Sequence, residues 1–157
     1  SSPAGVALCV AAVALGLSAG ANAQVRVDVT NLVTDDPTVH AGQITDAGLV
    51  NAWGLSYSPM SPFWVSSNGN DTAVLYAVSP STQATTKVGL TVSVPVGGVT
   101  GQVFNSAGAG AFNGDNFLFV GESGGIAGWR GALGTTAEML QLPSTDNVYK
   151  GAAFATL

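Results

Sequence analysis

Glu122, Asn51 and Asn105 are the side chains of this chain that could together hold a divalent metal ion. Glu122 ends the apolar run 117–121, and the two asparagines stand beside two other apolar segments. Ca²⁺ and other hard cations bind carboxylate and carboxamide oxygens, provided that several converge on one centre. The sequence therefore offers these three residues as candidate metal ligands. The simpler interpretation, which we favour, is that Glu122 lies at a solvent-facing strand end.

His40 and Cys9 add little further chemistry. His40 is the single histidine and lies in a polar segment with Asp35 and Asp36, where no serine partner for nucleophilic catalysis can be assigned. We interpret it as an exposed loop residue. Cys9 is the single cysteine and lies in an apolar segment, so the chain beyond it has no thiol for a disulfide or a metal site. We predict no catalytic residue and no bound cofactor, with Ca²⁺ or another divalent ion as the alternative.

Other polar and aromatic residues have a functional and a structural interpretation. Asn68 to Asp71 could form a calcium site, but Asn-Gly between two strands is a hairpin signal, and we favour the turn. Trp53, Trp64 and Trp129 could stack on a sugar, but their apolar neighbours favour packing in the core. Lys150 could pair with an acidic residue of a neighbouring unit, although a plain surface lysine is the preferred interpretation.

The first 23 residues carry no charge, and Ala21-Asn22-Ala23 follows an apolar run at 4–17. This pattern is typical of a secretory signal peptide cleaved after Ala23, with an uncleaved anchor as the alternative. We expect a signal-peptide helix at 1–23, no stable membrane span after processing, and a secreted or periplasmic protein from residue 24 onward. The net charge is −5, with four basic residues in 157, which argues against nucleic acid as a partner.

Short apolar runs separated by turn-forming residues predict an all-β fold. Gly54, Gly101 and Gly151 each begin such a run at nearly equal intervals of about 50 residues, a spacing typical of β-propeller blades. The predicted strands are 53–58, 63–67, 73–78 and 85–94 in the first blade, and 100–106, 117–122, 126–130 and 136–142 in the second. A β-sandwich is the alternative architecture. We expect residues 24–157 to be the N-terminal part of a propeller, with a closing strand at 25–33 and a third blade that starts at 151–156 and is truncated.

Six segments carry a resemblance to a known family. They are Asn31-Leu32-Val33-Thr34-Asp35, 51–59 with 62–69, 100–105, 124–129 and Val148-Tyr149-Lys150-Gly151. In this order they resemble an uncharacterised family of exported bacterial proteins with expected β-propeller folds. The resemblance implies further blades beyond residue 157 and supplies no catalytic residue. More distantly, the repeats are similar to six-bladed propellers of the NHL and gluconolactonase kind, which include binding proteins and metal-dependent lactonases.

Two functions follow as hypotheses. The first is a secreted binding module, monomeric when full length, for an extracellular or envelope ligand such as a peptide or a glycan. It is preferred because no nucleophile stands beside a base in the sequence. The second is a metal-dependent hydrolase or lactonase with Glu122, Asn51 and Asn105 among its ligands. Convergence of these three side chains in space would favour the second hypothesis.

Overall fold

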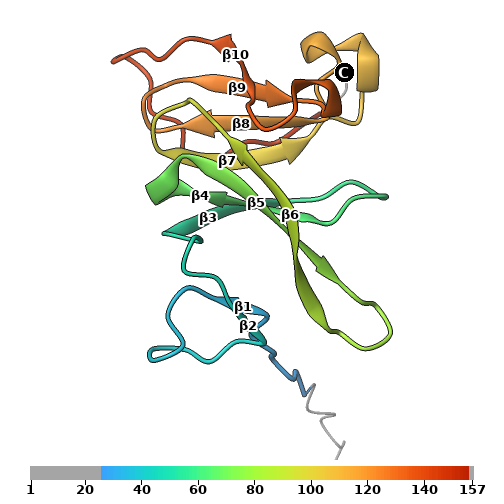
Figure 1. Cartoon of the computed structure of the whole chain (residues 1–157). Coiled ribbons are helices and arrows are strands. Elements are labelled where there is room, and N and C mark those ends of the chain that lie inside the picture. Colours follow the sequence, from blue (N-terminus) through green and yellow to red (C-terminus); the bar gives the residue numbers. More distant parts are fainter. Residues whose placement is uncertain (1–25, 156–157) are drawn as a thin grey trace, which may run out of the picture.

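The computed structural model describes residues 26–155 and shows an all-β chain with two four-stranded antiparallel sheets (Figure 1). The first sheet has the order β3-β4-β5-β6, and its strands are β3 (Ala52–Ser56), β4 (Phe63–Ser67), β5 (Thr72–Val78) and β6 (Thr85–Ser93). The second has the order β10-β9-β8-β7, with β7 (Val99–Phe104), β8 (Phe117–Gly121), β9 (Ile126–Trp129) and β10 (Glu138–Gln141). The predicted signal peptide at 1–23 lies outside the described residues.

All eight strands overlap the predicted ranges, so the predictions of an all-β chain and of these antiparallel strands are confirmed. Short 3-10 turns occupy several connections: η1 (Asn68–Asn70), η2 (Gly108–Gly110), η3 (Phe112–Gly114) and η4 (Gly131–Leu133). The Asn-Gly segment is a turn, as expected, but the left-handed backbone falls on Asp71, which has φ 50°. Asp adopts this left-handed backbone conformation more readily than most residues other than glycine do.

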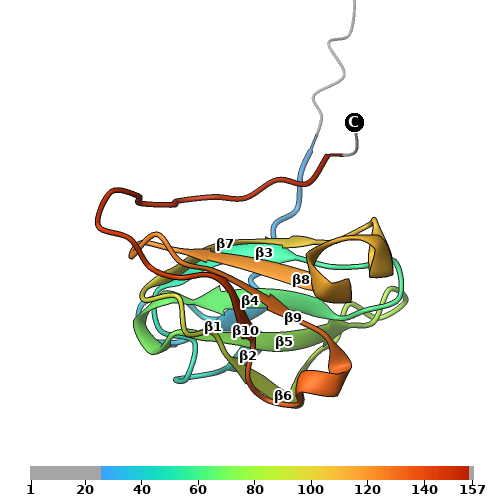
Figure 2. The ribbon, with the colours of Figure 1, turned by 90° about the horizontal axis from the view of Figure 1, so that it is seen from above.

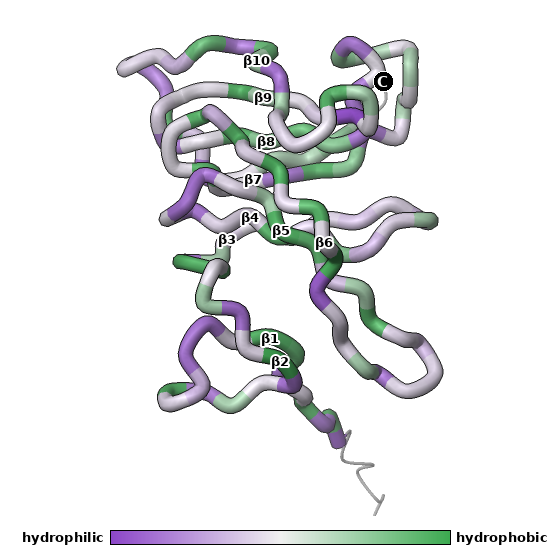
Figure 3. The backbone as a smooth tube through the Cα atoms, viewed as in Figure 1, coloured by the Kyte–Doolittle hydropathy of each residue, from purple (hydrophilic) through white to green (hydrophobic). Residues whose placement is uncertain are grey.

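Apolar side chains of both sheets form one core between them. Trp64 stacks on Phe117 with ring centroids 4.4 Å apart and meets Trp129 at 4.8 Å. Burial of these two tryptophans confirms their predicted packing role. Figure 3 shows apolar segments in both sheets, above all along β5, β6 and β8. The remaining core residues are Ala73, Leu75, Val92, Val94, Val96, Val99, Phe119, Ala127 and Ala137.

The first strands of the two sheets lie side by side, and glycine permits their close approach (Figure 2). A Cβ on Gly54 of β3 would overlap the carbonyl oxygen of Thr100 on β7. A Cβ on Gly101 would lie 2.6 Å from the Cα of Gly151 and the same distance from the nitrogen of Ala152. The segment around residue 151 therefore lies against β7 much as β7 lies against β3.

The opposite face of the first sheet is only partly covered. The short parallel pair β1 (Val33–Thr34) and β2 (Ile44–Thr45) packs over a small cluster that contains Leu49 and Tyr76. Beside it an apolar groove of about 320 Å³ is lined mainly by Leu32, Val33, Leu55, Phe63, Val65, Tyr76 and Val78. The predicted burial of Trp53 is wrong: it is 45% exposed, and its ring lies beside the ammonium group of Lys150 instead of in the core.

Two predicted strands are not formed within residues 26–155. The alternating pattern predicted a closing strand at 25–33, but residues 26–30 lie in no sheet. Backbone pairing begins at Asn31 and Leu32, whose carbonyl oxygens accept hydrogen bonds from the amides of Gln43 and Ile44, and it continues into β1. The described part of the predicted strand 151–156 runs along β7 without a ladder of its own. A strand requires a hydrogen-bonded neighbour, and the described chain places none beside residues 26–30 or 151–155.

Candidate functional site

Four polar residues and one tryptophan, Asn51, Trp53, Asn68, Glu122 and Lys150, meet at one edge of the two sheets. We call them the polar cluster. Asn51 directly precedes β3, Asn68 follows β4, and Glu122 follows β8. β3 and β4 are antiparallel, so the start of β3 and the end of β4 lie at the same edge. The start of β7 and the end of β8 lie together for the same reason. The topology therefore gathers residues distant in sequence.

Asn68 links the members of the polar cluster through its carboxamide. Its Nδ2 donates to the Val99 carbonyl oxygen at 3.1 Å and to Glu122 Oε2 at 3.3 Å. Its Oδ1 accepts a hydrogen bond from Asn51 Nδ2 at 3.0 Å. One side chain thus fixes the orientation of an asparagine of its own sheet and of a carboxylate of the neighbouring sheet.

Lys150 completes the cluster from the segment that follows β10. Its Nζ forms an ion pair with Glu122 Oε1 and lies 5.2 Å from the centroid of the Trp53 ring. The hydrogen bond from Lys150, followed by that from Asn68, holds the pKa of Glu122 below its ordinary value. The side chains of Lys150 and Glu122 are 54% and 39% exposed, so this charged and aromatic group is open to solvent.

The backbone positions Asn68 and Glu122 in the same way. The amide of Asn68 donates to the Asn51 carbonyl oxygen at 3.2 Å, and the amide of Glu122 donates to the Gly98 carbonyl oxygen at 2.9 Å. In both sheets the donor is the residue directly after the second strand, and the acceptor is the residue directly before the first strand. Asn68 and Glu122 therefore occupy corresponding places in the two sheets.

Asn105 does not join the other two candidate metal ligands. It follows β7 and lies opposite Asn116, at the far end of the β7–β8 pair from Glu122. β7 has six residues and β8 has five, so the separation is about 20 Å at roughly 3.3 Å per residue. Asn105 is buried, and its Nδ2 donates to the carbonyl oxygens of Gly108, Ala111 and Asp115. Its side chain organises the loop that precedes β8.

The described residues contain no group of three or more His, Cys, Asp or Glu side chains placed to hold a metal ion. Of the three predicted ligands, the structure brings Asn51 and Glu122 into one hydrogen-bonded network through Asn68. Both oxygens of Glu122 already have partners there, one in Lys150 and one in Asn68. Asp71, from the other possible calcium segment, accepts a hydrogen bond from the Val99 amide at 2.9 Å and ties the two sheets together.

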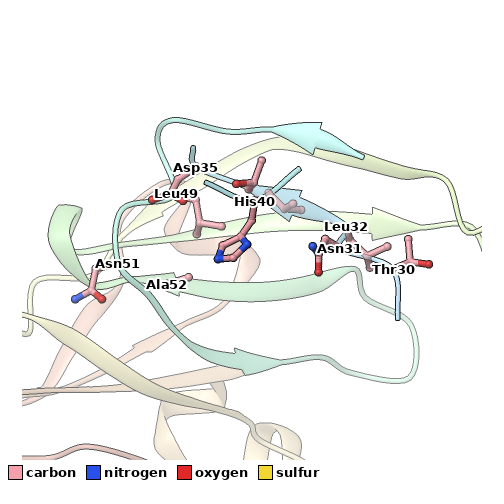
Figure 4. A pocket seen from close by; sticks show the side chains of 10 residues that line it. Thr30, Asn31, Leu32, Asp35, His40, Leu49, Asn51 and Ala52 are labelled. Atoms are coloured by element: carbon pink, nitrogen blue, oxygen red, sulfur yellow. The ribbon is translucent and has the colours of Figure 1, made fainter. Parts of the chain in front are cut away.

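A pocket of about 570 Å³ lies beside the polar cluster and includes His40 (Figure 4). Asp35 and Asn31 also line it, with Leu49 and Ala52 on the apolar part of the wall. His40 is exposed, as the sequence predicts. Asn51 belongs both to this pocket and to the polar cluster, so the two features adjoin.

Two other charged groups hold the fold together. Asp46 is buried, accepts a hydrogen bond from Tyr76 and pairs with Lys87. These contacts join the loop after β2 to the first sheet. Asp115 is buried and pairs with Arg130 at 2.7 Å, and Arg130 also pairs with Glu138 at 2.6 Å. Burial raises the pKa of Asp115, despite the opposing hydrogen bond from Arg130. These contacts lie within or between elements, so we assign them structural roles.

The sequence offered a pairing of Lys150 with an acidic residue of a neighbouring unit as the less favoured alternative, and the structure shows such a pair with Glu122. Sequence reasoning missed the contact of Lys150 with Trp53. The signal that could have found it is position: Lys150 directly precedes Gly151, as Trp53 directly precedes Gly54.

Among residues 26–155 no helix has the length and apolar character needed to cross a membrane. No protein-family model, no curated protein and no solved structure matches this chain.

Proposed function

We propose that the protein is a binding module and that its ligand, a peptide or a glycan, docks on the polar cluster. The observation that carries the proposal is the placement of Trp53, Lys150 and Glu122, from both sheets and the following segment, at one solvent-open edge. An exposed tryptophan beside charged groups offers both contact area and directional hydrogen bonds, a combination common at binding surfaces. The fixed carboxamides of Asn51 and Asn68 add donors and acceptors.

We further propose that the two four-stranded sheets are successive blades of a β-propeller. Their equal strand order, the matching backbone hydrogen bonds of Asn68 and Glu122, and the close contacts of Gly54 and Gly101 support this architecture. In such a fold the blades surround a central channel. The polar cluster, at the ends of the first two strands of each blade, would then face the mouth of that channel.

Export is part of the same proposal. The uncharged segment 1–23 ending in Ala21-Asn22-Ala23 supports cleavage after Ala23, and the ligand would then be extracellular or in the envelope. Expression of the full chain in a bacterial host, with N-terminal sequencing of the exported fraction, tests it. A first residue at Gln24 supports export, and an intact chain in the membrane or cytoplasm contradicts it.

A metal-dependent hydrolase is less well supported by the geometry. Asn105 lies at the opposite end of its strand from Glu122, and the carboxylate of Glu122 is engaged by an ammonium group. Within the described part of the chain we assign no nucleophile activated by a neighbouring base. A binding role requires neither converging metal ligands nor an activated nucleophile, so the arrangement favours a binding role.

Peptide and glycan arrays probed with the purified chain provide the test of ligand binding. The wild-type protein should retain a defined set of ligands, and Trp53→Ala should lose at least about tenfold in affinity for them, as expected for a central aromatic contact. Met60→Ala is the matched control, because Met60 is 95% exposed and is not part of the polar cluster. Ligands that bind both variants equally well would place the binding surface elsewhere.

A further inference from the structure

We propose that Glu122 and Trp53 form a binding site for the ammonium group of a lysine-bearing peptide, and that Lys150 occupies this site in the unliganded protein. The inference rests on the proposed function and names the class of ligand. The Lys150 ammonium pairs with Glu122 Oε1 and lies 5.2 Å from the centroid of the Trp53 ring. A carboxylate and an aromatic face within about 6 Å are the two groups that attract an alkylammonium ion.

The acceptor half of this site is held in place without Lys150. Glu122 Oε2 accepts a hydrogen bond from Asn68 Nδ2, and Asn68 is itself held by Asn51 and by the Val99 carbonyl oxygen. The amide of Glu122 is anchored on the Gly98 carbonyl oxygen at 2.9 Å. A carboxylate that is already oriented costs a ligand less ordering free energy than a mobile one.

Lys150 can leave the site by rotation of its side chain alone. The preceding residue fixes the backbone: the Tyr149 amide donates to the Gly121 carbonyl oxygen, and the Tyr149 carbonyl oxygen accepts from Thr100 Oγ1 at 2.7 Å. The Lys150 side chain is 54% exposed. Exposed ion pairs are weak, so the ammonium group of a ligand can replace that of Lys150.

The hydrogen bonding of Glu122 favours lysine over arginine. A guanidinium group binds best when both carboxylate oxygens are free to accept in parallel. Here Oε2 is engaged by Asn68, which leaves Oε1 for a point charge such as an ammonium ion. The net charge of −5 also attracts a basic peptide to the protein.

The test compares the wild-type chain with Lys150→Met, using acetylated trilysine amide as the probe and Trp fluorescence or calorimetry as the readout. Lys150→Met removes the internal competitor, so the probe should bind about two- to fivefold more tightly than to the wild type, because an exposed ion pair competes only weakly. Arg26→Gln is the control, since it removes one positive charge from an exposed residue outside the polar cluster. Lys150→Met should increase the affinity for acetylated triarginine amide less than it increases the affinity for acetylated trilysine amide.

Two further measurements decide between outcomes. In the Lys150→Met background, Glu122→Gln should abolish the gain, while Asp146→Asn, which removes an equal charge, should preserve it. In the wild type, the ¹³Cε resonance of Lys150 should move toward that of free lysine as trilysine is added, a readout that needs no variant to fold. Equal trilysine affinities of Lys150→Met and Arg26→Gln, or an unmoved Lys150 resonance at saturation, would overturn the inference. If the binding of an array ligand depends on Trp53 but is not reduced by added trilysine, the inference is overturned and the proposed function stands.

Discussion

Gly54 of β3 and Thr100 of β7 meet through their backbones, and the carbonyl oxygen of Thr100 occupies the space that a Cβ on Gly54 would need. Gly101 meets Gly151 in the same manner. Glycine is required at both positions by the distance between neighbouring segments, since neither has a positive φ. The contact explains why glycine begins these apolar runs, and it supports the proposal of successive blades.

Replacement of Gly54 by alanine should therefore destabilise the packing of the two sheets. The added methyl group meets backbone atoms that cannot move independently, so we expect a loss of about 1–3 kcal/mol in the free energy of unfolding. Gly89→Ala on β6 is the matched control, because nothing lies within 4 Å of its Cβ position. Urea denaturation of both variants measures the difference, and equal stabilities would contradict the role of Gly54.

Gln102 should stabilise the same contact through hydrogen bonds. Its buried side chain donates to the Gly54 carbonyl oxygen at 2.8 Å and to Ser66 Oγ at 3.0 Å. Gln102→Leu leaves these buried acceptors without their donor, at a cost of about 1–3 kcal/mol. A double-mutant cycle with Ser66→Ala should give a coupling of about 0.5 kcal/mol or more. The exposed Gln141→Leu should change stability by less than about 0.5 kcal/mol, and a similar value for Gln102→Leu would refute the prediction.

Asn105 and Glu122 should have separable roles. Asn105→Ala removes four hydrogen bonds to the loop before β8, three donated by Nδ2 and one accepted by Oδ1, and should lower the free energy of unfolding by about 2 kcal/mol or more. It should leave binding of the array ligand unchanged. Glu122→Gln should weaken that binding and leave the unfolding curve close to wild type, because its side chain is exposed. Calorimetry with Ca²⁺ checks the metal hypothesis: binding lost in both variants would show that the two residues share an ion.

Asp46 should make stability depend on pH in the acid range. Burial raises the pKa of Asp46, but hydrogen bonds from Lys87, Tyr76 and the Gly48 amide outweigh it and hold the pKa below its ordinary value of 3.8. A depressed pKa in the folded state means that this contribution is present above pH 3.8 and is lost as the pH falls through the lower folded value. The difference in unfolding free energy between wild type and Asp46→Asn, measured from pH 2 to pH 6, should grow with pH. A constant difference would disprove the coupling.

The eight strands could be predicted from the sequence because turn-forming residues separate short apolar runs. Local patterns were sufficient where both strands of a hairpin are close in the chain, as in β4 and β5. The parallel pairing of Val33 with Ile44 was not predicted, because it depends on the path of the polar loop between them. The exposure of Trp53 was missed for a similar reason: its apolar neighbours say nothing about whether a sheet covers that face.

The candidate site was only partly predictable. Glu122 and Asn51 stood out as polar residues at the ends of apolar runs, and the structure connects them through Asn68. Asn105 also ends an apolar run, but β7 and β8 are antiparallel, so Asn105 after β7 and Glu122 after β8 lie at opposite ends of the pair. The approach of Lys150 to Glu122 depends on how the segment after β10 packs, and the sequence signals it only through the position of Lys150 directly before Gly151.

The central claim, that the polar cluster is the ligand-binding surface, is tested most directly by ¹H–¹⁵N chemical-shift mapping with the tightest ligand from the arrays. The account predicts that the largest changes fall on the Trp53 indole, the Asn68 carboxamide and the amides of Glu122 and Lys150. Changes confined to the pocket around His40 or to the apolar groove beside Leu55, with the polar cluster unaffected, would contradict it.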